Sequence, residues 1–194
     1  MRLPERSGDQ RLIGVSITIP EPHHSALQEA RARFGDPMAS AIPPHITLLG
    51  PTIVEPEETA AVQAHLDAVA AGHAPFTVRL RGTGTFRPVS QVAFVQVADG
   101  IAGCEQLEQE VRSGPLDQEL RFHYHPHVTV AHELADESLD EAIDELAEFD
   151  ATFVVDSFEC YVHDEGAWHV VTRHALGAEP AEPAQADEHE PRAV

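Results

Sequence analysis

The chain of 194 residues carries 33 acidic residues against 12 basic ones, which gives a formal net charge of −21 at neutral pH. All twelve basic residues are arginines, and the lack of lysine excludes a lysyl–nucleotide intermediate, a P-loop lysine and a Schiff base. Such acidity also argues against binding along an extended nucleic-acid strand, which requires basic patches.

The first half of the chain predicts strand, helix, strand, helix and strand in that order. Alternating apolar and polar residues indicate the strands, and apolar residues at helical spacing indicate the helices. The predicted elements are a strand at 12–18, a helix at 21–33, a strand at 45–49, a helix at 57–71 and a strand at 76–82.

The second half repeats this order. Its predicted elements are a strand at 92–97, a helix at 101–111, a strand at 127–131, a helix at 136–149 and a strand at 152–162, followed by a strand at 168–172 without a counterpart. Such self-similarity is the signature of a duplicated structure. We expect an α+β fold of two pseudo-symmetric lobes, each an antiparallel sheet flanked by helices, around a central cleft.

These repeats define the expected domain organisation. We predict a single bilobal domain at 1–176, with the first lobe at about 12–84 and the second at about 91–174. The remaining segment, 177–194, is rich in Ala, Glu and Pro with almost no large apolar residue, and predicts a disordered acidic tail.

One short motif occurs at equivalent places in both repeats. Pro44 to Leu48 reads Pro-His-Ile-Thr-Leu, and Pro126 to Val130 reads Pro-His-Val-Thr-Val. On a strand, residues i and i+2 point to the same face, so His and Thr of each copy face the cleft together. The aliphatic residues between them then anchor each strand in its lobe.

Two opposed histidines suit displacement at phosphorus. One neutral imidazole removes a proton from the attacking water, and the other, protonated, donates one to the leaving oxygen. The threonine hydroxyls are placed to hydrogen-bond the non-bridging phosphate oxygens. We therefore predict His45 and His127 as the catalytic pair, Thr47 and Thr129 as phosphate ligands, and no metal or other cofactor.

With both motifs in place, the chain resembles the 2H phosphoesterase superfamily, which includes the 2′–5′ RNA ligase (LigT-like) proteins and RNA 2′,3′-cyclic phosphodiesterases. The resemblance covers about 12–172. It implies metal-independent hydrolysis of 2′,3′-cyclic phosphates of small nucleotides or RNA ends, with 2′–5′ RNA ligase-like activity as an accompanying reaction. It also assigns the acid/base roles to His45 and His127 and phosphate binding to Thr47 and Thr129.

Further residues are candidates for substrate binding. An anionic substrate in an acidic protein needs a local cation, and Arg173 after the last predicted strand is one candidate. Tyr124, three residues before the second motif histidine, is placed to stack on a base. The expected partner is a small phosphodiester or an RNA end, with no extended nucleic acid and no membrane.

Two other functions compete with this interpretation. His123, His125 and His127 alternate along the chain, as in a three-histidine zinc site, which would make the protein a metallohydrolase. The same cleft would also suit a nucleotide-binding module without turnover. The first repeat has no matching His-x-His, and binding alone would not require both His and Thr in both copies.

The location is predicted from three absences. No apolar run reaches the roughly 18 residues of a membrane span. Met1 to Arg11 is polar, unlike a signal peptide. Cys104 and Cys160 offer no disulfide framework and no CxxC metal knuckle. We expect a cytoplasmic protein that acts as a monomer.

Overall fold

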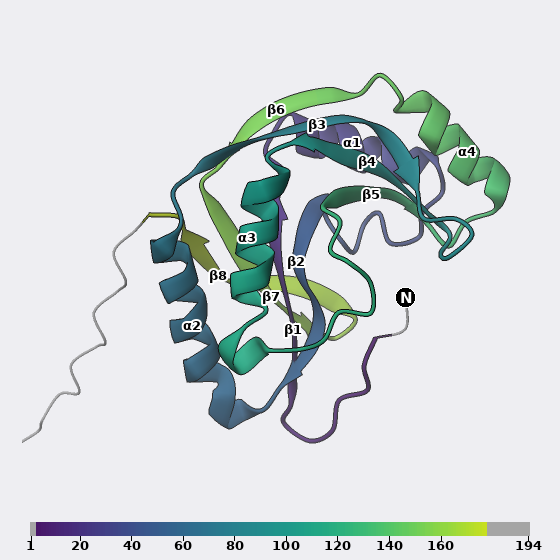
Figure 1. Cartoon of the computed structure of the whole chain (residues 1–194). Helices are drawn as coiled ribbons and strands as arrows, with labels where there is room; N and C mark the ends of the chain where they lie inside the picture. The colour runs from purple at the N-terminus through teal and green to yellow at the C-terminus, as the bar shows by residue number, and fades with distance from the viewer. Residues whose placement is uncertain (1–2, 178–194) are drawn as a thin grey trace, which may run out of the picture.

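Strands and helices alternate twice along the chain, as the sequence predicts (Figure 1). The computed structural model describes residues 3–177, so the acidic segment predicted at 177–194 lies outside the described residues except for Gly177. The strands are β1 (Arg11–Thr18), β2 (His45–Val54), β3 (Phe76–Thr85), β4 (Val92–Asp99), β5 (His127–His132), β6 (Asp150–Val155), β7 (Ser157–Asp164) and β8 (Ala167–Ala175). The helices are α1 (His23–Arg33), α2 (Thr59–Gly72), α3 (Ile101–Val111) and α4 (Asp136–Glu145), with short 3₁₀ turns at Pro56–Glu58 and Gly114–Leu116.

The eight described strands form one antiparallel sheet in the order β6-β3-β4-β5-β2-β1-β7-β8. The two lobes are therefore not separate sheets. They are joined at β2 and β5, where one Cα pair, Ile46 with Val128, is in register. This seam separates the half β2-β1-β7-β8 from the half β5-β4-β3-β6.

The half β5-β4-β3-β6 consists of four strands that are consecutive in the chain, whereas the other half combines β1 and β2 with the last two strands, β7 and β8. β3, which ends the first sequence repeat, lies between β4 and β6, whereas β7 pairs with β1. The repeats therefore recur as an order of elements, but neither half of the sheet is built from one repeat alone. Hydrophobic periodicity identifies strands without specifying their partners, so this exchange is invisible in the sequence.

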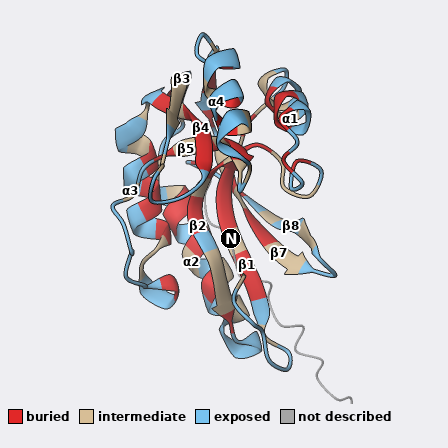
Figure 2. Ribbon diagram, turned by 90° about the vertical axis from the view of Figure 1, so that its right-hand side faces the viewer, coloured by how far each residue is buried: buried red, intermediate tan, exposed pale blue. Residues whose placement is uncertain are grey.

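Two helices pack against each half of the sheet. Helix α2 contacts β8 and α3 contacts β2, whereas α1 contacts β5 and α4 contacts β3, β4 and β5 (Figure 1). The core reflects the alternation predicted for the motif strands, because Ile46, Leu48, Val128 and Val130 are all buried (Figure 2). The α+β, two-lobed fold class is confirmed.

Several element boundaries differ from the prediction; β2, for example, continues to Val54 instead of ending at 49, and β3 continues to Thr85 instead of ending at 82. The strand expected at 152–162 is two strands, β6 and β7, which lie in different halves of the sheet and are separated by Asp156. The Asp156 carbonyl accepts a hydrogen bond from the Leu176 backbone (2.8 Å) as the chain passes between the halves. Helix α4 ends at Glu145 instead of continuing to 149. Among residues 3–177, no helix combines the length and apolarity needed to cross a membrane.

Candidate active site

The two predicted motifs lie side by side at the seam of the sheet. β2 begins at His45 and β5 at His127, and the residues after these histidines, Ile46 and Val128, pair across the seam. Because Ile46 and Val128 point into the core, the four predicted polar side chains of the motifs point to the opposite face. With a rise of about 3.4 Å per residue and strands about 4.8 Å apart, the histidine Cα atoms lie roughly 8 Å from each other.

Both histidine rings are held in the same way. Nδ1 of His45 lies 2.7 Å from the carbonyl oxygen of Pro43, and Nδ1 of His127 lies 2.7 Å from that of His125. A carbonyl oxygen only accepts, so each Nδ1 carries the hydrogen. In the neutral ring, Nε2 then keeps its lone pair and is the atom available for proton transfer.

The environment lowers the pKa of both histidines. Burial is the main cause for His45, and the nearby Arg31 guanidinium lowers its pKa further, against the opposing effect of the Pro43 hydrogen bond. For His127, burial chiefly lowers the pKa to about 4, and positive charge on His125 or His45 would lower it further. Both imidazoles are therefore neutral at pH 7 in the free protein.

An aromatic group surrounds His127. The rings of Phe86 and Phe94 lie 4.9 and 5.2 Å from the His127 ring, centroid to centroid, and the His125 ring lies 6.1 Å away. Phe94 is the cross-strand neighbour of Thr129, so it shares the motif face. Phe86 and Phe94 are not predicted from the sequence, because their role depends on the pairing of β4 with β5.

A polar group lies beside His45. Thr18 of β1 is the cross-strand partner of His45. The Thr18 hydroxyl donates to the Glu159 carboxylate and lies 2.8 Å from the Tyr161 hydroxyl, which itself donates to Glu159 at 2.7 Å. Burial is the main cause that raises the pKa of Tyr161, to about 12, so its hydroxyl keeps its proton. None of the three is predicted from the sequence, since Thr18 and Glu159 meet only through the β1–β7 pairing.

A buried ion pair supports the approach to the first motif. Arg31 and Asp36 are each only 4% exposed, and their Nε and Oδ2 atoms are 2.7 Å apart. The Arg31 guanidinium also donates to the carbonyl of Ile42 (2.9 Å), immediately before the proline whose carbonyl holds His45. Arg31 thus anchors the loop that orients His45.

Tyr124 and Arg173 are the two further residues predicted to bind substrate, and the structure brings Tyr124 to the motifs. Tyr124 is partly buried, and its hydroxyl donates to the Thr47 carbonyl (2.9 Å), which places it against the first motif strand. Burial chiefly raises its pKa well above the usual range. Its hydroxyl therefore ties the segment before the second motif to the first motif.

Arg173 lies elsewhere. It is an exposed residue on the edge strand β8, three strands from β2, which is about 14 Å at ordinary strand spacing. Its guanidinium donates to Ser157 (2.9 Å) and Asp156 (3.2 Å). The structure does not bring Arg173 together with the motifs, because β7 and β1 intervene.

The three alternating histidines do not converge. Only His127 belongs to a strand, since β5 begins after Pro126; His125 lies against the aromatic group, and His123 lines a groove beside α3. Within residues 3–177, no group of three or more His, Cys, Asp or Glu side chains is arranged to hold a metal ion. The arrangement considered for a zinc site is therefore not formed.

Comparison with known proteins places the chain among phosphoesterases. The family model described as the 2′-5′ RNA ligase superfamily matches residues 19–167. A Bacillus licheniformis protein named "Putative phosphoesterase" is 33% identical over 151 residues, covering 76% of this chain and 88% of that protein. A similarly named protein of Halalkalibacterium halodurans is 28% identical over 169 residues, covering 86% of this chain and 98% of that protein.

Solved structures share the fold. The apo crystal structure of E. coli LigT superposes with a TM-score of 0.63 at 20% identity, covering 87% of this chain and 99% of that one. A Thermus thermophilus protein gives a TM-score of 0.56 at 24% identity, with the same coverages of 87% and 99%. E. coli LigT has also been crystallised with 3′-AMP and with phosphate.

Proposed function

The chain belongs to the 2′-5′ RNA ligase superfamily, and from this premise we propose that it is a metal-independent phosphodiesterase that hydrolyses 2′,3′-cyclic phosphates of small nucleotides or RNA ends. The observation that carries the proposal is the matched pair of histidines. Both Nδ1 atoms are anchored on the carbonyl two residues earlier, on neighbouring strands, which leaves two Nε2 atoms on one face.

In the proposed reaction the two histidines move protons in opposite directions. One neutral Nε2 removes a proton from water as the water oxygen attacks phosphorus. The bond from phosphorus to O2′ or O3′ breaks, and the other histidine, protonated, transfers a proton to the departing oxygen. The product is a phosphomonoester, and a proton exchange with solvent resets the pair.

The negative charge of the bound substrate favours the protonated form of one of the two histidines. Both pKa values are lowered in the free protein, so neither ring holds a second proton at pH 7. A phosphodiester anion bound beside the rings favours the imidazolium form of one of them and raises its pKa. The threonine hydroxyls, Thr47 and Thr129, would donate to the non-bridging oxygens where negative charge develops.

The ligands of a structural relative agree with this substrate class. E. coli LigT binds 3′-AMP and phosphate in its crystals, and 3′-AMP is one product expected from an adenosine 2′,3′-cyclic phosphate. If an RNA 5′-hydroxyl replaced water, attack with loss of O3′ would form a 2′–5′ linkage through the same two proton transfers. We therefore include ligation as an accompanying reaction of the site.

The test is hydrolysis of the four nucleoside 2′,3′-cyclic monophosphates, with and without a metal chelator. We expect turnover that survives the chelator and falls about 10²–10⁴-fold in His45→Ala and in His127→Ala. His169→Ala, an exposed histidine of β8, is the matched control and should retain the rate. Turnover that disappears with the chelator, or that survives both motif substitutions, would contradict the two-histidine mechanism.

A further inference from the structure

A surface groove runs beside the second motif, between α3 and the segment 117–124. It has a volume of about 630 Å³ and is lined by Glu105, Glu108, Gln109, Arg112, Leu120, Arg121, Phe122, His123 and Tyr124. Volumes between about 300 and 1,000 Å³ are typical of sites for small ligands. Tyr124, one of these lining residues, donates its hydroxyl to the Thr47 carbonyl, which connects the groove to the first motif strand.

The segment that forms the outer wall is anchored at both ends. Arg112, just after α3, donates to the Gln118 carbonyl (2.8 Å), and the Gln118 side chain donates to Thr52 of β2 (3.1 Å). At the other end, Tyr124 is fixed to Thr47. The segment that carries Leu120, Arg121 and Phe122 is therefore held at both of its ends.

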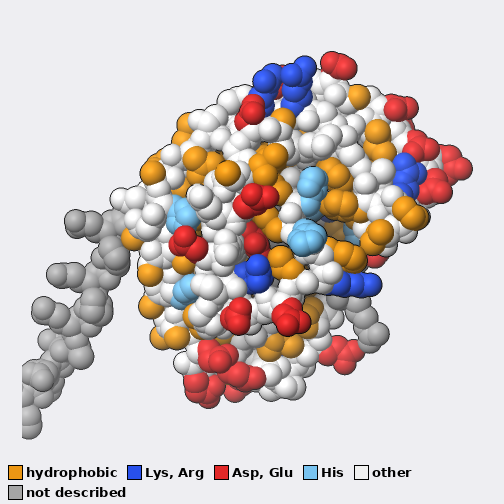
Figure 3. All heavy atoms as spheres, in the orientation of Figure 1, with side chains coloured by type: hydrophobic (Ala, Val, Ile, Leu, Met, Phe, Trp, Pro, Cys, Tyr) orange, Lys and Arg blue, Asp and Glu red, His pale blue; other side chains and the backbone are white. Residues whose placement is uncertain are grey.

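Two exposed apolar side chains lie on this wall. Phe122 is 59% exposed and Leu120 is 45% exposed, because no other part of the described chain covers them. The Arg121 guanidinium lies 5.1 Å from the centre of the Phe122 ring. Figure 3 shows histidine side chains near the middle of the face that carries α3, with hydrophobic side chains beside them. An exposed ring with a cation at its face is a suitable platform for a nucleobase.

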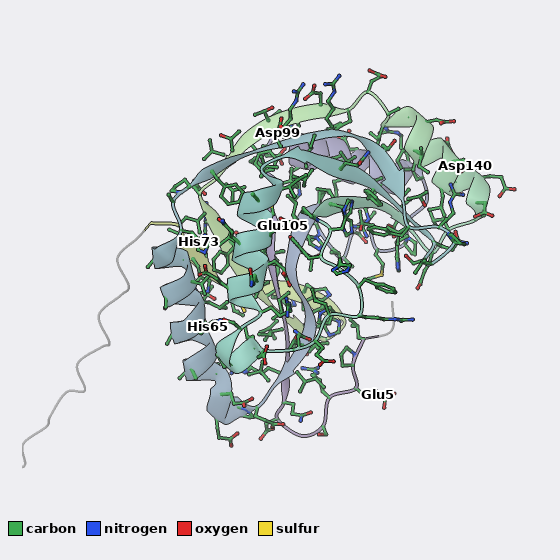
Figure 4. The ribbon with its side chains drawn as sticks, viewed as in Figure 1. Glu5, His65, His73, Asp99, Glu105 and Asp140 are labelled. Atoms are coloured by element: carbon green, nitrogen blue, oxygen red, sulfur yellow. The ribbon has the colours of Figure 1, made fainter. Side chains whose placement is uncertain are left out.

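The charge of the groove sets it apart from the rest of the protein. Its four charged carboxylate and guanidinium groups balance, two against two, in a chain whose net charge is −21. Arg112 is paired with Glu108 (2.5 Å), while Glu105 on α3 remains as the second acid (Figure 4). Arg121 is left as the cation of this groove.

Arg121 is also unusual among the arginines. Eight of the ten in residues 3–177 lie within 4.0 Å of a carboxylate, namely Arg6, Arg31, Arg33, Arg79, Arg81, Arg87, Arg112 and Arg173. Only Arg11 and Arg121 have no such partner among the described residues. An arginine without a carboxylate, in a groove whose Tyr124 contacts the first motif strand, is a suitable group to contact a second phosphate.

From these observations we propose that the groove binds the nucleotide upstream of the cyclic phosphate in an RNA end. Its base stacks on Phe122, and Arg121 contacts the phosphate that joins it to the terminal nucleoside. This inference rests on the proposed function and adds a second subsite to it. The substrate is then a short oligonucleotide end, held at two points, in preference to a mononucleotide.

The experiment compares two substrates that differ by one nucleotide. These are adenosine 2′,3′-cyclic monophosphate and adenylyl-(3′→5′)-adenosine 2′,3′-cyclic phosphate. We expect kcat/KM to be at least about tenfold higher for the dinucleotide, as one stacked base and one phosphate contact predict. Equal values for the two substrates in the native protein would overturn the proposal.

Substitutions in the groove test whether the groove causes the preference for the dinucleotide over the mononucleotide. Phe122→Ala should bring the dinucleotide close to the mononucleotide value, and Arg121→Ala should lower the dependence of log kcat/KM on log salt by about 0.7. Neither substitution should change mononucleotide hydrolysis. Val154→Ala (60% exposed, on β6) and Arg81→Ala (63% exposed, on β3) are matched controls outside the groove. A preference that persists in both groove variants would place the second subsite elsewhere and contradict the proposal.

Binding separates the failure of this inference from that of the proposed function. Calorimetry would compare 3′-AMP with the dinucleotide that carries the same 3′-phosphate. If neither cyclic substrate is hydrolysed but the dinucleotide binds more tightly in a Phe122-dependent way, the subsite stands and the catalytic proposal falls. If affinity does not depend on length either, the subsite is wrong as well.

Discussion

At the scale of single residues, the motif histidines combine identical anchoring with different neighbours. Each ring donates Nδ1–H to a backbone carbonyl, yet His127 has phenyl rings around it and His45 has Thr18 and a nearby guanidinium. The backbone therefore sets the tautomer in the same way twice, while the surroundings make the two rings chemically distinct. That asymmetry allows one ring to prefer the base role and the other the acid role.

The pH dependence of catalysis follows from the two lowered pKa values. A histidine with a lowered pKa loses its proton at lower pH, so both limbs of the bell-shaped kcat/KM profile shift toward acid. We expect an optimum below about pH 6.5, the usual histidine value. The apparent values belong to the coupled pair. Steady-state hydrolysis between pH 4 and 9 measures this, and an optimum above neutrality would contradict it.

Arg31 and Asp36 form a pair whose two members should depend on each other. Removing the guanidinium in Arg31→Met leaves a buried carboxylate uncompensated, which costs about 3–5 kcal/mol. The double variant Arg31→Met/Asp36→Asn should recover much of this loss. Urea denaturation of the two single variants and the double variant completes the cycle. Additive losses would show that the pair is not coupled.

At the scale of elements, β3 and β4 determine the position of the aromatic group. Gly84 on β3 faces Phe94 on β4, and a Cβ at this glycine would approach the phenyl ring to 2.7 Å. The glycine thus makes room for the ring that packs against His127. The close fit links a strand of one sequence repeat to a motif histidine of the other.

We expect Gly84→Ala to displace Phe94 and to reduce kcat/KM about tenfold, with a loss of stability of about 1–3 kcal/mol from overpacking. Gly50→Ala on β2 is the control, because nothing lies within 4 Å of its added Cβ. Cyclic-nucleotide hydrolysis and urea denaturation of both variants provide the readouts. Native activity in Gly84→Ala would mean that the ring position does not matter for catalysis.

Local pattern was enough to predict both motifs and most elements, although it joined β6 and β7 into one strand. Alternation located β2 and β5, and the recurrence of Pro-His-x-Thr brought attention to His45 and His127 before any pairing was known. What could not be predicted depends on which strand pairs with which. Thr18 meets Glu159, and Phe94 meets Thr129, only through β1–β7 and β4–β5 pairing. Arg173 lies on β8, which continues beyond the predicted 168–172, and the position of β8 at the sheet edge takes Arg173 away from the motifs.

At the scale of the whole molecule, the two halves of the sheet meet at a narrow seam. β2 and β5 share the one register pair Ile46 and Val128, whereas the neighbouring strand pairs β1–β2 and β4–β5 are in register over longer stretches. The motif residues stand where the halves meet, so the geometry of the proposed site depends on how the halves are oriented. Tyr124, bonded to Thr47 across this junction, is one of the contacts that fixes that orientation.

The exchange of strands between the halves also has a consequence for synthesis on the ribosome. Thr18 on β1 bonds Glu159, which lies 141 residues further along the chain. The half of the sheet that contains β1 is therefore incomplete until Glu159 has been synthesised. At translation rates of about 5–20 residues per second, this delay is on the order of ten seconds. During that interval the apolar faces of β1 and β2 have no β7 beside them. The half β5-β4-β3-β6, whose strands span 76–155, therefore has all its strands before the half that contains β1 and β2, which still needs β7 and β8.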